Sequence, residues 1–228
     1  MVNDNYFLNK GFEKNGEDIY VYKNFVSEEE LAVINPILDT IRINAEYNPS
    51  HAGTHFEKRV TREIKELEFL PKRIEDMFGS DYIVHQYITS NILSVGDDWG
   101  EHFDSNDFIQ LRELAKTLKE GEPYEVLQDS HYGIVVYFNT PEEGGELVYT
   151  SQGISYTPNP GDLVVHSSEK NCMHLVKEVT KGYRYSYSNH LGVELRVPKC
   201  SDDNCPGTYP DCSRYDNFYG YTSNKIEK

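Results

Sequence analysis

The sequence predicts a mainly β protein with flanking helices, whose second half folds as a sandwich or jelly roll. Its 18 tyrosines and 10 phenylalanines, with 1 tryptophan, bring aromatic residues to 13%, and aromatic residues are enriched in strands. Five short strand candidates follow one another closely, at 132–138, 146–150, 162–166, 174–179 and 183–191. Clusters rich in Gly and Pro separate most of them, and closely spaced strands with such turns are typical of antiparallel sandwiches and jelly rolls.

A helix is predicted to begin near residue 27. Ser27 and Glu30 have the spacing of a capping box, and Val26 and Leu31 form a hydrophobic staple across it. Apolar residues continue at helical spacing as far as residue 41, which predicts one buried helix face. Pro36 lies inside this pattern, so the helix should be kinked or restarted there.

Between this helix and the strand-rich half, the pattern alternates. Residues 19–22 read as a short strand, 63–78 as a helix broken near Pro71, and 81–95 as strand-like. After a turn at 96–100 comes an insert over 105–128, with apolar residues at helical spacing. The insert could form a wall or lid, or a packed surface helix, and both interpretations stay open.

The length of 228 residues predicts a single domain over residues 1–228. Its β core is expected at about 82–191, with N-terminal helical support over 19–78. The C-terminal segment 198–228 contains cysteines and is rich in Pro, Gly and Asp, so it is expected to be a loop-like tail.

Charge and hydropathy exclude several classes of protein. The chain has 22 basic and 38 acidic residues, a net charge of -16, which repels phosphate backbones and argues against a nucleic-acid partner. No apolar run approaches the ~20 residues of a membrane-spanning helix, and residues 1–5 lack the start of a signal peptide. We therefore expect a cytoplasmic protein without membrane contact.

The residue pattern with most chemical content is His102-Phe103-Asp104, followed far downstream by His174. Side chains two apart on a strand point the same way, so His102 and Asp104 could share one metal with His174. Two histidines and one carboxylate leave open positions and are typical of Fe(II) oxygenases. Arg184, ten residues after His174, could bind a carboxylate through its fork of donors, with Ser186 as a neighbouring hydroxyl.

The strand at 183–191 predicts two different faces. Alternation places one set of polar side chains together, namely Arg184, Ser186, Ser188 and His190. Three tyrosines lie on the opposite face, at 183, 185 and 187.

The other histidines and the cysteines have more ordinary interpretations. His166 precedes the distal histidine and is expected at a strand end, without a metal. Cys200, Cys205 and Cys212 could bind zinc with Cys172 or His190 as a fourth ligand. Their spacing is not that of a zinc finger, and free or partly paired thiols are the alternative.

Taken in order, these segments resemble the iron(II) and 2-oxoglutarate-dependent dioxygenases, especially the prolyl 4-hydroxylase-like branch. The resemblance runs from about residue 82 to 191 and rests on five segments, at 96–104, 144–147, 160–166, 174–179 and 182–186. The helix start at 26–31 is also similar to this branch. The sequence departs from the branch at Leu93 and Trp99, where tyrosines are frequent, at His190, where tryptophan is frequent, and at Arg184, where collagen-type enzymes often have lysine.

The resemblance implies a double-stranded β-helix, a jelly roll of cupin-like form. His102, Asp104 and His174 would bind Fe(II), and Arg184 would pair with the distal carboxylate of 2-oxoglutarate. Decarboxylation to succinate, with O₂ as the oxidant and ascorbate available as a reductant, would be coupled to hydroxylation of an unactivated C–H bond. The carboxylate of Asp104 argues against halogenation, and His190 occupies the position of a second arginine in nucleic-acid demethylases.

The resemblance favours a prolyl residue of a protein or peptide as the substrate. A free amino acid or another small metabolite is an alternative. A third hypothesis, from a different class, is a non-catalytic jelly-roll module for binding or sensing. The oligomeric state is not predicted.

Overall fold

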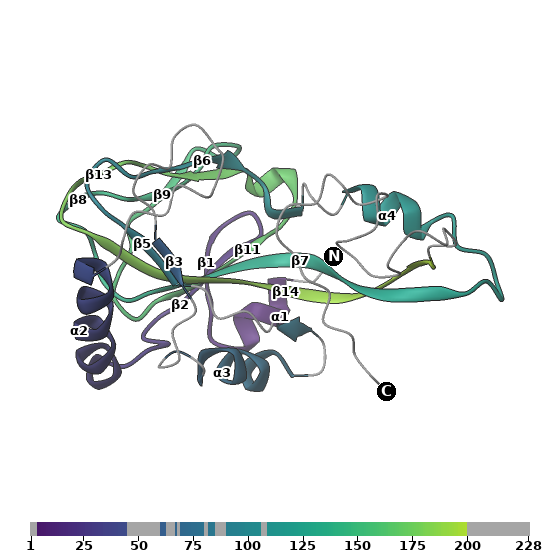
Figure 1. Cartoon of the computed structure of the whole chain (residues 1–228), viewed down its shortest axis with the longest axis horizontal. Coiled ribbons are helices and arrows are strands. Elements are labelled where there is room, and N and C mark those ends of the chain that lie inside the picture. The colour runs from purple at the N-terminus through teal and green to yellow at the C-terminus, as the bar shows by residue number, and fades with distance from the viewer. Residues whose placement is uncertain are drawn as a thin grey trace.

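The computed structural model describes residues 4–44, 60–62, 67, 69–79, 82–84, 90–105 and 109–199. A large sheet runs through the middle of the molecule, with helices on one side and a smaller sheet on the other (Figure 1). The helices on the first side are α1 (Asp4–Asn9), α2 (Glu28–Asn44) and α3 (Phe69–Phe78). This layered antiparallel arrangement confirms the mainly β, jelly-roll fold with flanking helices.

Eight strands form the large sheet within the described ranges, and all their pairings are antiparallel. In spatial order seven of them are β1 (Glu13–Gly16), β2 (Ile19–Tyr22), β11 (Leu163–Ser167), β7 (Tyr124–Tyr137), β14 (Arg184–Pro198), β5 (Ser90–Leu93) and β3 (Val60–Arg62). The eighth, β4 (Ile83–Val84), pairs with β14 beside this path.

The smaller sheet brings together strands that are distant in sequence. Its order in the described part is β10 (Ile154–Tyr156), β9 (Leu147–Tyr149), β12 (His174–Val176) and β6 (Trp99–His102). A short pair of β8 (Glu143–Gly144) and β13 (Val179–Lys181) lies next to them. A 3-10 turn at Lys170–Cys172 precedes β12.

Hydrophobic side chains fill both sides of the large sheet. On the helix side, Phe7, Leu38 and Ile74 from the three helices join one buried cluster with Tyr185 and Tyr187 of β14. Between the two sheets lies a second cluster that includes residues of both, among them Leu93, Val135, Val164, Leu147, Tyr149 and Val176. Strand β14 therefore turns its tyrosines toward the helices and its polar residues toward the smaller sheet, as the alternation predicts.

The start of α2 confirms the predicted capping box. The backbone N–H of Ser27 donates to Oε2 of Glu30 at 2.9 Å, and the backbone N–H of Glu30 donates to Oγ of Ser27 at 3.3 Å. The helix then continues as one element through Pro36 to Asn44, so of the two alternatives, a kink or a restart, the restart does not occur. The hydroxyl of Thr40 donates to the Pro36 carbonyl at 2.8 Å, one turn further along the helix.

The strand boundaries differ from the predictions in two places. The segment 174–179 is divided into β12 and β13, which pair with different strands. The last strand does not stop near residue 191, because β14 and β7 pair as a long two-stranded ribbon that reaches Pro198 and Tyr124. This ribbon extends beyond the sandwich as an arm, with α4 (Ile109–Ala115) above it (Figure 1). The first half of β7 includes one Glu, one Gln and one Asp, which hid it from a search for apolar strands.

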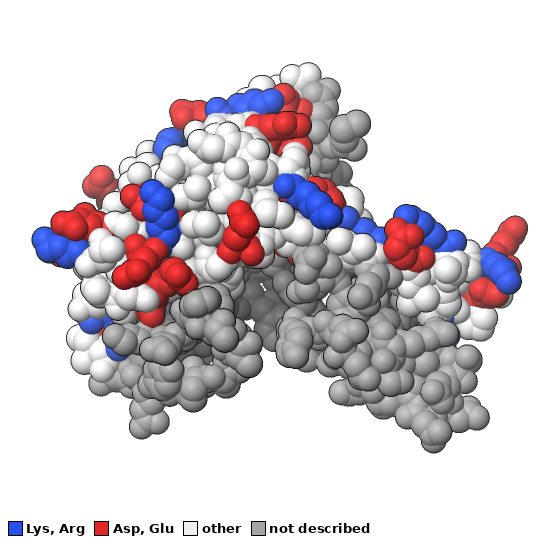
Figure 2. All heavy atoms as spheres, turned by 90° about the horizontal axis from the view of Figure 1, so that it is seen from above, with Lys and Arg blue, Asp and Glu red and all other residues white. Residues whose placement is uncertain are grey.

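Two further properties concern the surface. Among the described side chains on the face seen in Figure 2, basic and acidic groups lie side by side, and none of this described surface forms a broad basic patch. Within the described residues, no helix is long and apolar enough to cross a membrane. The predicted tail from residue 200 onward, with its three cysteines, lies outside the described residues.

Candidate active site

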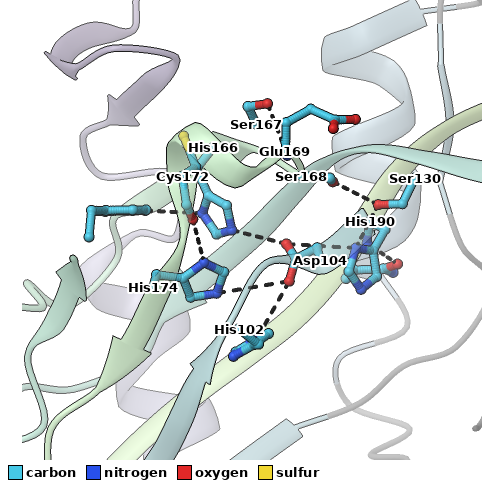
Figure 3. Close-up of polar contacts among 12 residues, drawn as sticks. His102, Asp104, Ser130, His166, Ser167, Ser168, Glu169, Cys172, His174 and His190 are labelled. Atoms are coloured by element: carbon cyan, nitrogen blue, oxygen red, sulfur yellow. Dashed lines mark hydrogen bonds and ion pairs between the residues drawn. The ribbon is translucent and has the colours of Figure 1, made fainter. Parts of the chain in front are cut away.

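Three predicted ligands meet where the smaller sheet ends. His174 on β12 is paired directly with His102 at the end of β6, and Asp104 follows two residues after His102. One ligand atom of each residue lies within 4.8 Å of those of the other two. Figure 3 shows the three side chains converging from these segments. The structure thus brings together residues that are 70 positions apart in the sequence.

Hydrogen bonds fix the orientation of both imidazole rings. Nδ1 of His102 lies 2.8 Å from the carbonyl oxygen of Gly100, and Nδ1 of His174 lies 2.9 Å from that of Cys172. A carbonyl only accepts, so each Nδ1 carries the proton and each Nε2 has a free lone pair. Those Nε2 atoms face Asp104, at 3.6 and 3.9 Å from Oδ1. Such a backbone bond behind the ring is usual for histidines that bind metals.

The protonation states also suit a cation. Burial lowers the pKa of His174 to about 3, so this ring is neutral at neutral pH. Burial by itself raises the pKa of Asp104, but the hydrogen bond from His166 holds it well below its usual range. A neutral imidazole and an ionised carboxylate are the forms that metals bind. The donor set therefore fits a divalent ion with two nitrogens and one oxygen from the chain, and Fe(II) is the metal typical of such a set.

His166 contacts this site, which the sequence did not reveal. It is 1% exposed, and its Nε2 lies 3.0 Å from Oδ2 of Asp104, while its Nδ1 lies 3.0 Å from the Tyr149 hydroxyl. It stands near the end of β11, as expected, and the metal-ligand group of the described residues does not include it. An apolar strand ending in histidine gives no sign of the partner, because Asp104 comes from another sheet.

A second polar group lies on the same side of the large sheet, at the start of β14. Arg184 is 3% exposed; its Nη1 donates to Oγ of Ser186 at 2.9 Å and its Nη2 donates to the Tyr137 hydroxyl at 3.3 Å. Its Nε is buried without a hydrogen-bond partner, and no acidic side chain of the described residues pairs with it. An unpaired buried cation is costly. This group therefore fits the carboxylate of a bound acid.

Tyr137 is the member of this group that the sequence analysis missed. It is fully buried on β7, and its paired residue on β14 is Ser186. Burial raises the pKa of Tyr137, so the hydroxyl remains neutral and can donate to a carboxylate. Leu93 is paired with Arg184 on the other side, at the position where the dioxygenases that the sequence resembles often have tyrosine. A hydroxyl therefore reaches Arg184 from β7, although the residue on β5 is apolar.

The turn between β8 and β9 allows the chain to approach this group closely. Gly145 has a φ of +73° and lies where an added Cβ would be 2.8 Å from Pro141 and 3.3 Å from Cδ of Arg184. Any side chain there would be strained and would crowd the guanidinium stem.

The described part of the insert packs as a surface helix. Leu111 of α4 is buried, and Arg112 reaches both carboxylate oxygens of Asp129 from its Nε, at 2.9 and 2.8 Å. Arg112 also donates to the Ser130 carbonyl at 2.8 Å and pairs with Glu169 in the loop after β11. These contacts tie the insert to the arm of β7 and β14 and to the loop that leads to β12. A role of the insert as a wall or lid remains a prediction.

The zinc hypothesis concerns residues that are mostly outside the described part. Of its proposed ligands, Cys172 is a buried free thiol beside the Glu17 carbonyl, and burial raises its pKa to about 12. His190 instead faces Asp104, with Nδ1 3.0 Å from the Ser130 hydroxyl.

Comparison with known proteins agrees with this geometry. Residues 84–191 match the family described as the 2OG-Fe(II) oxygenase superfamily. No curated protein sequence matches the chain. The match spans both proposed metal-binding segments and Arg184, and the family implies Fe(II), 2-oxoglutarate and O₂.

Several solved structures share the fold at low sequence identity. The viral collagen prolyl hydroxylase of Paramecium bursaria Chlorella virus-1, solved with 2OG, has a TM-score of 0.54 at 15% identity, covering 78% of this chain and 97% of that one. A prolyl-4-hydroxylase of Pseudomonas putida has a TM-score of 0.52 at 13% identity, covering 77% and 92%. A Trichoplax adhaerens prolyl hydroxylase, in complex with a peptide fragment of hypoxia inducible factor, has a TM-score of 0.56 at 14% identity, covering 82% and 88%. Residues 84–191 thus match the 2OG-Fe(II) oxygenase superfamily, and the chain shares the fold of these prolyl hydroxylases.

Proposed function

We propose that this protein is an Fe(II)- and 2-oxoglutarate-dependent hydroxylase that acts on a prolyl residue of a protein or peptide. The observation that carries the proposal is the combination of two features on one side of the large sheet. These are the ligand atoms of His102, Asp104 and His174 within 4.8 Å, and the buried guanidinium of Arg184 without an acidic partner among the described residues.

In this proposal His102, Asp104 and His174 hold Fe(II), and the carbonyls of Gly100 and Cys172 keep both rings oriented. Arg184 receives the distal carboxylate of 2-oxoglutarate, with the hydroxyls of Ser186 and Tyr137 beside it. The cosubstrate's carboxylate neutralises the buried cation, which favours its binding in one orientation. With O₂, a bound iron would supply the oxidising chemistry by which 2-oxoglutarate becomes succinate and CO₂ while a C–H bond of the substrate becomes C–OH.

Apolar residues of the core between the sheets pack behind the proposed metal ligands. Tyr149, Val176 and Leu147 belong to the buried cluster between the sheets, next to the ligand strands. A low-dielectric surrounding strengthens the attraction between the bound cation, Asp104 and the cosubstrate.

A peptidyl-prolyl substrate is supported by the fold and by the substrates of the similar structures. The viral protein is a collagen prolyl hydroxylase, and the Trichoplax prolyl hydroxylase was solved in complex with a hypoxia inducible factor peptide fragment. At 13% to 15% identity, these structural similarities support the fold. They also indicate proline-containing peptides as the first class of substrate to test.

The test is succinate formation by anaerobically Fe(II)-loaded protein on exposure to O₂, with ascorbate, with and without a panel of proline-containing peptides. We expect a peptide to stimulate turnover and to gain the mass of one oxygen atom. Turnover without any stimulation by peptides would contradict the prolyl substrate and lead to free amino acids and other small molecules.

Asp104→Ala is the matched control, because it removes the carboxylate and leaves the strand pairing of His102 with His174 intact. We expect no succinate from this variant. Bound iron without turnover in the wild-type protein would contradict the enzymatic proposal and favour a sensor or binding module.

A further inference from the structure

Three neighbouring strands of the large sheet form a gap directly below Asp104. Gly133 of β7 is paired with His166 of β11 on one side and with His190 of β14 on the other. Paired residues on antiparallel strands point to the same face, so the two histidines flank a position that has no side chain. We call the three residues His166, Gly133 and His190 the histidine notch.

The carboxylate of Asp104 fills this notch. A Cβ added at Gly133 would lie 2.0 Å from Oδ2 of Asp104 and 2.5 Å from Nε2 of His166. Any residue larger than glycine would have to displace one of the two. Glycine is therefore required here by the close approach of a side chain, with no unusual backbone angle involved.

His166 holds this carboxylate through a directed chain of hydrogen bonds. An ionised carboxylate only accepts, so the Nε2–H of His166 donates to Oδ2 of Asp104 at 3.0 Å. Nδ1 then has a lone pair and accepts from the Tyr149 hydroxyl at 3.0 Å. Tyr149 and His166 are both buried, so water does not compete for either bond. The dashed lines in Figure 3 follow the contact from His166 to Asp104.

The opposite side of the notch is also fixed. Nδ1 of His190 lies 3.0 Å from the Ser130 hydroxyl, which contacts the Ser168 hydroxyl at 2.8 Å. The same Nδ1 is 4.0 Å from Oδ2 of Asp104, too far for a hydrogen bond but close enough to limit the movement of the carboxylate. As a result Oδ2 is engaged by the large sheet, and Oδ1 faces the Nε2 atoms of His102 and His174.

We propose that His166 is a positioning residue that, with Gly133, makes Asp104 a one-oxygen ligand by retaining its second oxygen in the histidine notch. The proposal rests on the metal site of the proposed function. It differs from a purely structural role of His166, which would stabilise the fold without affecting metal affinity. A second metal site at the notch would be a different hypothesis. The metal-ligand group of the described residues contains neither notch histidine.

The test is the affinity for Fe(II), titrated anaerobically by calorimetry, and the absorption spectrum of the Co(II)-substituted protein. His166→Leu removes the donor, whereas His166→Gln retains an N–H of similar reach. We expect H166L to weaken Fe(II) binding by about 10- to 100-fold, as loss of an outer hydrogen-bond partner usually does. H166Q should regain most of this affinity, and the Co(II) spectrum of H166L should differ from that of the wild-type protein.

Tyr156→Phe is the control for a loss of stability alone. Tyr156 is a buried tyrosine between the same sheets, and its hydroxyl donates to Asp162 at 2.6 Å. We expect Y156F to lower the unfolding temperature and to bind Fe(II) like the wild-type protein. Gly133→Ala should weaken metal binding at least as much as H166L, because its Cβ occupies the place of Oδ2.

The outcomes separate this inference from the proposed function. Equal Fe(II) affinity of the wild type and H166L, with D104A unable to bind, would overturn the positioning role alone. Two metal ions per wild-type chain, one of them lost in H166L, would also overturn it. A wild-type protein that binds no metal, or a D104A variant that binds as well, would overturn the metal site itself and the notch with it.

Discussion

The two faces of the large sheet differ sharply, although the same strands make both. On the helix side, Tyr185 and Tyr187 of β14 join an aromatic and aliphatic cluster around Phe7. On the other side, the alternate residues Arg184 and Ser186 are just as buried, but polar. The helix side gains free energy of folding by removing apolar area from water. The site side places a cation and ionisable groups where burial opposes folding.

This difference teaches that burial alone does not identify a residue's role. Each buried polar group on the site side either has a fixed hydrogen-bond partner or is placed to bind a ligand. His166 has Tyr149 and Asp104 as partners, whereas the Nε of Arg184 has none in the described structure. Mutations on the two faces should therefore separate stability from ligand binding, and the following predictions test that separation.

The largest expected effect comes from removing a proposed metal ligand on β12. His174→Ala should abolish succinate formation and lower Fe(II) affinity by more than the about 100-fold typical for loss of an outer partner. Its free energy of unfolding without metal should fall by about 1–3 kcal/mol, because loss of the buried ring leaves the Cys172 carbonyl without its donor. Anaerobic calorimetry and urea unfolding measure the two quantities. Metal binding unchanged in H174A would remove this residue from the site.

The matching change on the helix side is Phe7→Ala. Phe7 is fully buried, stacks on Tyr20 with ring centroids 4.2 Å apart, and meets Phe12 and Tyr132 edge to face. Its loss should lower the free energy of unfolding by about 3–5 kcal/mol, measured by urea denaturation. Fe(II) affinity of the folded fraction should stay at the wild-type value, and a large loss of affinity would contradict the separation of the faces.

Arg184→Met tests the site side directly. Removing the cation should weaken 2-oxoglutarate binding by about 2–5 kcal/mol, the range for truncating one partner of a buried charged pair. The free energy of unfolding without cosubstrate should equal or exceed that of the wild-type protein, because an unpaired buried charge is replaced by an apolar chain. Arg184→Lys, which retains the charge but not the fork, should bind at an intermediate level. A marked loss of stability in R184M would show that Arg184 contributes to the fold.

The smallest expected effect is on stability and concerns an ion pair between helices α2 and α3. Arg73 holds Glu30 at 2.5 and 2.9 Å, and its hydrogen bond is the main cause that lowers the pKa of Glu30 to about 2. Glu30→Gln should cost about 1 kcal/mol of unfolding free energy at neutral pH, since the pair is partly exposed and the capping box is weakened.

The sign of its pH dependence follows from the lowered pKa. The stabilisation by Glu30 is complete above its unfolded pKa, near 4.5, and is lost as the pH falls toward about 2. The difference between wild type and E30Q should therefore shrink over this range in urea titrations. A constant difference from pH 7 to pH 2 would contradict the role of the charge.

Local patterns predicted much of the architecture. The capping box at Ser27 and Glu30 and the alternation along β14 depend on neighbours within a few residues, so the sequence is sufficient to recognise them. The segments 85–89 and 200–228 were also assigned from sequence, but they lie outside the described residues and their assignments stay predictions. The domain limits stay predictions as well.

The sequence by itself determined the layered β fold, the start of α2 and the residues that could bind a metal, because spacing and side-chain chemistry are local properties. Only the tertiary structure decided that His166 and Gly133 lie under Asp104, that Tyr137 reaches Arg184, and that β7 and β14 extend as an arm. Those contacts join strands across two sheets, and their register depends on the packing of the whole core, which no short stretch of sequence encodes.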